Sequence, residues 1–157
     1  MLKRSLASLT AALLAAVLNP VLADNRCTGT GTTQNTDLGT LLAGKLVCAY
    51  KEGQKTNPNA RWSEMHTGTG VGASTLGEHG RGTTDTAGSY DANIGTWQIS
   101  GNTVVYNYTD DGSYTYEIWE APGTGPWYFC DASDNVAAIS DTIIAIPPTT
   151  ATNPCGY

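Results

Sequence analysis

Two histidines, and the glutamate beside one of them, are the residues of this chain with the clearest potential for metal chemistry. Glu64 and His66 alternate along one predicted strand and so share a face, while His79 follows on a later segment rich in glycine. Imidazole and carboxylate groups are ligands of zinc and copper. The three residues are therefore a candidate metal site. Two surface histidines on a loop-rich edge explain the same pattern more simply, because the spacing does not enforce a site.

Catalytic signatures are sparse. The chain has no Gly-x-Ser-x-Gly motif, and its cysteines are expected in disulfides rather than as nucleophiles. Glu64 with Glu78, or Asp110 with Glu117, could be paired as in a glycosidase. Acidic residues on the turns of an exported protein are more often simply solvated. The sequence therefore favours a protein without enzymatic activity, and it predicts no catalytic residue and no cofactor.

Aromatic residues form the second candidate site. They gather in and just after residues 95–119, where alternate positions of a strand share one face. Such rings on neighbouring strands can stack on a sugar, a flavin-like ring or another small organic ligand. The same rings can also serve only as cross-strand packing. The candidate ligand-binding residues are Trp97, Tyr106, Tyr108, Tyr114, Tyr116 and Trp127.

The segment 95–119 must position most of these rings. It alternates apolar and polar residues in three runs, separated by turn residues at 100–102 and 110–112, which predicts an antiparallel meander. Its first residues, Gly95-Thr96-Trp97, resemble the Gly-x-Trp signature of the lipocalins and avidins, the calycin-type barrels. That resemblance implies an up-and-down barrel with a ligand cavity. In that family the motif opens the first strand, whereas here about half of the mature chain precedes it.

The remaining elements are short. N-cap chemistry before three leucines at helical spacing predicts a helix over 36–43, with glycine at position 44 as its stop. Turn signals between the apolar runs predict an all-β fold: a single antiparallel up-and-down barrel or sandwich of about seven or eight short strands. The two earliest strands also resemble segments of small secreted bacterial proteins with no assigned function. Outside the meander, strands are expected at Lys45–Tyr50, Arg61–His66, 75–79, Trp127–Cys130 and 136–146.

The ends of the chain predict export. Residues 1–23 combine a basic start at Lys3 and Arg4, an apolar stretch and small residues before a cleavage site, as in a secretory signal peptide. Residues 24–157 then form one disulfide-stapled domain, which is secreted or periplasmic. The formal net charge of −6 argues against nucleic acid and anionic membrane surfaces as partners.

Four cysteines in a small exported domain predict two disulfides. Three connectivities are possible. The favoured one joins Cys48 to Cys130, since both lie in strand-like runs, and Cys27 to Cys155, since both lie in irregular terminal segments. The main alternative pairs neighbours in sequence, Cys27 with Cys48 and Cys130 with Cys155.

Two functions follow from this reading. The first is a binding module for a small ligand, aromatic or sugar-like, held on the aromatic face. The second is a structural subunit of an extracellular fibre or surface layer, in which copies of the chain assemble through strand edges and the terminal segments 24–34 and 147–157. The predicted partner is accordingly either a small molecule or another copy of the same chain.

Overall fold

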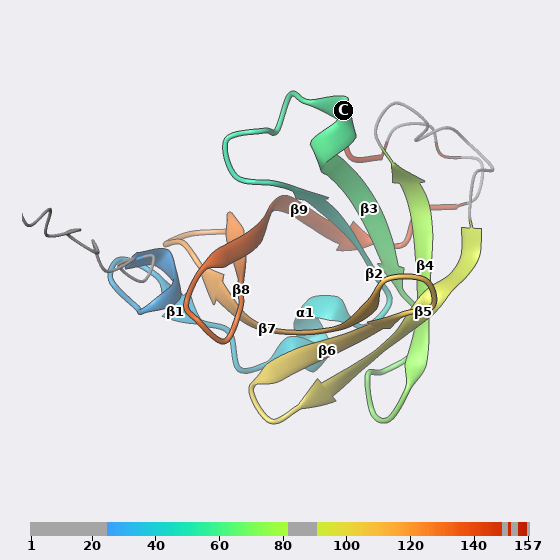
Figure 1. The fold of residues 1–157 in the computed structure, drawn as a ribbon, viewed down its shortest axis with the longest axis horizontal. Coiled ribbons are helices and arrows are strands. Elements are labelled where there is room, and N and C mark those ends of the chain that lie inside the picture. Colours follow the sequence, from blue (N-terminus) through green and yellow to red (C-terminus); the bar gives the residue numbers. More distant parts are fainter. Residues whose placement is uncertain (1–24, 82–90, 149–150, 152–153, 157) are drawn as a thin grey trace, which may run out of the picture.

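The fold is a closed antiparallel β-barrel with one additional short strand. A computed structural model describes residues 25–81, 91–148, 151 and 154–156. Eight strands, β2 to β9, form the barrel, and β1 pairs with β7 beside it. In Figure 1 these strands run in a ring round the helix α1. The strands are β1 (Thr33–Gln34), β2 (Lys45–Tyr50), β3 (Arg61–His66), β4 (Ser74–Arg81), β5 (Asp91–Ser100), β6 (Thr103–Tyr108), β7 (Gly112–Glu120), β8 (Trp127–Cys130) and β9 (Val136–Ala145).

The predicted fold class is confirmed, and the barrel is the correct alternative of the two. Each strand from β2 to β8 pairs with the next one along the chain, and β9 returns to pair with β2. Strands β2, β3 and β8 have the predicted bounds, and β5 to β7 are the predicted meander. The sequence analysis missed β1 and two 3-10 turns, η1 (Asn25–Cys27) and η2 (Pro58–Ala60). The predicted signal peptide lies outside the described residues. No described helix is long and apolar enough to cross a membrane.

The helix α1 (Leu38–Leu42) closes one end of the barrel. The Asp37 side chain accepts a hydrogen bond from the Thr40 N–H at 3.1 Å, which caps the first turn as the sequence predicted. Leu38 and Leu42 are buried in the same core cluster as the inward-facing residues of the strands. A helix of this length is unstable in water, so burial of these two leucines holds it in place.

The two faces of β2 belong to different clusters. Val47 and Ala49 point into the barrel core, whereas Leu46 and Cys48 lie in a second cluster with Met65 on the outer face. This alternation is the one that the sequence predicted for β2.

The sequence predicts a strict alternation along 136–146, with Ala138 and Ile144 on one face and Ile143 on the other, and this is wrong in the second half of β9. Ala138 packs in the barrel core, but so does Ile143, while Ile144 packs on the outer cluster. The pairing with β2 shifts between Cys48 and Ala49, whose partners are Thr142 and Ser140. One extra residue in β9 at this bulge exchanges the two faces beyond it.

The favoured disulfide connectivity is also wrong. The disulfides join Cys27 to Cys130 and Cys48 to Cys155. Because β9 lies between β2 and β8, Cys48 and Cys130 sit two strands apart, about 10 Å, which exceeds the reach of a disulfide. Each strand cysteine is instead bonded to a terminal segment that covers the outside of its strand. The two disulfides are typical of an oxidising compartment, outside the cell or in a periplasm.

Candidate functional site

The predicted aromatic face is the inner wall of the barrel. In the registers of β5, β6 and β7, Trp97 lies opposite Tyr106, and Tyr106 lies opposite Tyr114. Tyr108 and Tyr116 share the inward face of the same strands, since they lie two residues away from Tyr106 and Tyr114. The structure thus brings these five rings together, as the period-two pattern indicated.

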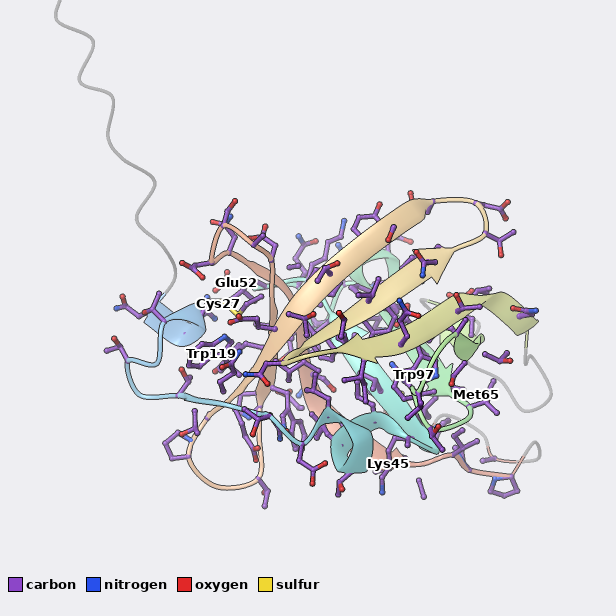
Figure 2. The ribbon with its side chains drawn as sticks, turned by 90° about the horizontal axis from the view of Figure 1, so that it is seen from below. Cys27, Lys45, Glu52, Met65, Trp97 and Trp119 are labelled. Carbon is purple, nitrogen blue, oxygen red and sulfur yellow. A yellow bond between two sulfur atoms is a disulfide. The ribbon has the colours of Figure 1, made fainter. Side chains whose placement is uncertain are left out.

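Two of these rings belong to the core. Trp97 is 0% and Tyr106 is 2% exposed. The Trp97 indole N–H donates to the Thr67 carbonyl at 3.0 Å, and Figure 2 shows Trp97 inside the barrel wall. Gly95 allows the close approach of β5 to β6, because a Cβ at that position would lie 2.1 Å from the Asn107 carbonyl oxygen. In this chain the Gly-x-Trp residues therefore serve packing and strand approach.

The other three rings lie on β6 and β7, the two strands joined by the turn at 109–111. Tyr108 and Tyr116 are half-buried, and Tyr114 is 37% exposed. The centroids of Tyr114 and Tyr116 are 6.3 Å apart with nearly parallel rings, and those of Tyr108 and Tyr114 are 5.8 Å apart. Tyr114 is thus exposed although its cross-strand partner Tyr106 lies in the core. Tyr108, Tyr114 and Tyr116 are called the mouth tyrosines below.

Two polar pairs lie among these rings. The Tyr108 hydroxyl donates to the Glu64 carboxylate at 2.7 Å, and deeper in the barrel His66 Nε2 lies 2.8 Å from the Tyr106 hydroxyl. Burial, with the Glu64 charge adding to it, raises the pKa of Tyr108 well above its usual value. Tyr108 therefore stays protonated and acts as a hydrogen-bond donor.

The histidine of the inner pair is a core residue. His66 is 0% exposed, and its ring meets Trp97 edge-on with centroids 5.1 Å apart. Burial lowers the pKa of His66 to about 4, against a smaller opposite effect of nearby backbone carbonyls. His66 Nδ1 is buried without a hydrogen-bond partner. The ring is thus a neutral imidazole at neutral pH.

The metal-site prediction remains untested. Glu64 and His66 do share the inward face, but each is hydrogen-bonded to a tyrosine. The side chain of His79 lies outside the described residues. Within the part of the chain that the structure describes, no three histidine, cysteine or acidic residues are grouped as metal ligands would be.

Trp127, the sixth predicted residue, lies apart from the mouth tyrosines, at a groove beside α1. The groove has a volume of about 290 Å³. Sequence reasoning missed its other residues, because they come from segments far apart in the chain and form no local motif. The groove is lined by Asn35, Asp37, Thr40, Leu41, Lys45, Trp127 and Ile143.

Comparison with known proteins gives no relative for this chain: no family model, no curated protein and no solved structure matches it. The closed antiparallel barrel is consistent with a calycin-like fold.

Proposed function

We propose that this protein is an exported binding module that holds a small ligand with an aromatic or sugar-like ring at the open end of its barrel. The observation that carries the proposal is the exposure of Tyr114, an inward-facing ring on β7 whose cross-strand partner Tyr106 is in the core. Aromatic walls with a few fixed polar groups are typical of small-molecule sites in barrel mouths.

The mouth tyrosines offer both ring surfaces for stacking and a hydrogen-bonded polar group. Tyr114 and Tyr116 present nearly parallel rings, which suits stacking of a flat ligand against them. Tyr108 donates a hydrogen bond to the buried Glu64, and this pair can orient a polar substituent. Burial raises the pKa of Tyr116 to about 12, and the charges of Glu64, Asp131 and Asp111 add to this shift. Because the field at this ring is negative, the ligand is neutral or cationic.

Native mass spectrometry of the protein, purified from its own exported fraction, tests the proposal. A monomer with a discrete added mass is expected. In the double variant Tyr114→Ala/Tyr116→Ala that ligand should bind roughly thirtyfold more weakly or be lost, since each stacked ring contributes roughly 1 kcal/mol. Thr115→Ala is the matched control, because Thr115 lies between the two tyrosines in sequence and faces outward. Equal binding by the double variant would contradict the site.

The alternative, a structural subunit that assembles through edges and termini, receives less support. Closure of the barrel pairs its strands on both sides over most of their length, which leaves little edge for another chain. Cys27 and Cys155 hold the described terminal segments against the barrel. In the same spectrum, a ladder of oligomers without added mass would favour this alternative.

A further inference from the structure

The groove beside α1 combines apolar, aromatic and polar side chains from three parts of the chain. It exists because β8 begins only at Trp127, opposite Ser140, whereas β9 continues past Ser140 to Ala145 in its pairing with β2. The helix α1 and the residues before it cover this shortened part of the wall incompletely. A hollow of about 290 Å³ remains between α1, β8 and β9.

The wall of the groove is fixed in place. Gly125 packs against the Trp127 ring so closely that a Cβ at Gly125 would lie 2.8 Å from it. Leu41 and Ile143 are half-buried and pack against the barrel core. The Trp127 indole N–H is buried without a hydrogen-bond partner. A buried donor without an acceptor is costly, so an acceptor that reached this wall would be stabilised there.

Two opposite charges stand at the groove. The Lys45 ammonium and the Asp37 carboxylate both line it, and neither takes part in an ion pair within the described residues. Figure 2 shows Lys45 next to α1. One oxygen of Asp37 accepts the Thr40 N–H at the helix start. Lys45 would repel a cation and Asp37 an anion, so together they favour a ligand without net charge.

We propose that this groove is a second binding site, separate from the mouth tyrosines, and that it takes a neutral saccharide. A sugar ring offers a C–H face that packs on Trp127, Leu41 and Ile143. Its hydroxyl groups donate and accept hydrogen bonds, which matches the ammonium, carboxylate, amide and hydroxyl groups around the groove. The volume of about 290 Å³ lies just below the range for drug-sized ligands, about 300 to 1,000 Å³, which suits a small ligand of one or two sugar rings.

The test is titration of the intact, disulfide-bonded protein with glucose, galactose, N-acetylglucosamine, maltose and cellobiose, followed by NMR. At least one saccharide should shift the indole N–H signal of Trp127, assigned through its loss in Trp127→Phe, together with the methyl signals of Leu41 and Ile143. Lys45→Met should weaken this binding about tenfold, since it removes a charge-assisted hydrogen bond and keeps the aliphatic stem. Lys51→Ala, at an exposed lysine outside the groove, should leave it unchanged.

Two outcomes would overturn the proposal. One is the absence of shifts at Trp127, Leu41 and Ile143 with every saccharide up to about 10 mM, an affinity too weak to be specific. The other is saccharide-induced shifts at Tyr114 and Tyr116 alone, which would assign sugar binding to the barrel mouth and leave the proposed function standing. If Lys45→Met does not fold, Thr40→Val is the second variant. It removes one hydroxyl group of the groove from an exposed position.

Discussion

At the scale of single residues, the inward face of the barrel divides into core and surface within a few positions. Trp97, Tyr106 and His66 are fully buried, Tyr108 and Tyr116 are half-buried, and Tyr114, directly opposite Tyr106, is exposed. The same residue type thus serves packing at one position and is exposed at its cross-strand neighbour.

The buried His66 makes the stability of the fold depend on pH. Its pKa falls from an ordinary value near 6.5 to about 4 on folding, so between these values the unfolded chain binds more protons than the folded one. The contribution of neutral His66 to the free energy of unfolding is fully present above pH 6.5. It is lost as the pH falls toward 4, by up to about 3 kcal/mol. Urea unfolding at pH 7 and at pH 5 should show this loss.

Variants of the two histidines identify the source of that loss. Carboxylates also titrate below pH 5, so the pH range above 5 is the one in which the effect of His66 can be separated from theirs. His66→Gln should lower stability at pH 7 and flatten the pH dependence between 5 and 7. His79→Gln should leave the dependence in place. An unchanged slope in His66→Gln would refute the assignment.

At the scale of elements, the short helix α1 closes the barrel by burying two leucines rather than by its own helical stability. Leu38 is 1% and Leu42 is 0% exposed, whereas Leu41 on the same helix is half-buried at the groove. The helix thus joins the sealed end of the core to the candidate saccharide site.

Truncation of the two helix leucines should have unequal effects. Leu42→Ala is expected to lower the free energy of unfolding by about 2 to 5 kcal/mol, because it leaves a cavity in the core. Leu41→Ala, the same chemical change at a half-buried position, should cost clearly less. Denaturant unfolding measures both, and equal losses would show that α1 does not seal the core in this way.

At the scale of the whole molecule, the two disulfides attach both terminal segments to the barrel. Cys27 and Cys130 are 103 residues apart, and Cys48 and Cys155 are 107 apart. Both bonds close long loops, which restricts the unfolded chain strongly. The second also places Cys155 against the cluster of Leu46 and Met65 on the outer face of β2 and β3.

Removal of one disulfide should therefore reduce stability without changing the fold. Cys48→Ser/Cys155→Ser is expected to lower the free energy of unfolding by roughly 2 to 5 kcal/mol. Peptide mapping of the unreduced protein should recover Cys27 with Cys130 and Cys48 with Cys155. Recovery of Cys48 linked to Cys130 would contradict the arrangement described here.

The sequence alone determined whatever depends on neighbouring residues. Strand alternation, turn residues and the N-cap at Asp37 act over a few positions, so they predicted the meander, the helix and the shared face of Trp97, Tyr106 and Tyr114. The tertiary structure decided the rest. In the closed barrel Trp97 is buried and Tyr114 is exposed. The order of the strands determined which cysteines form disulfides, and a bulge reversed the faces of β9. The groove brings together Asp37, Lys45, Trp127 and Ile143, because contacts between distant segments leave no trace in local spacing.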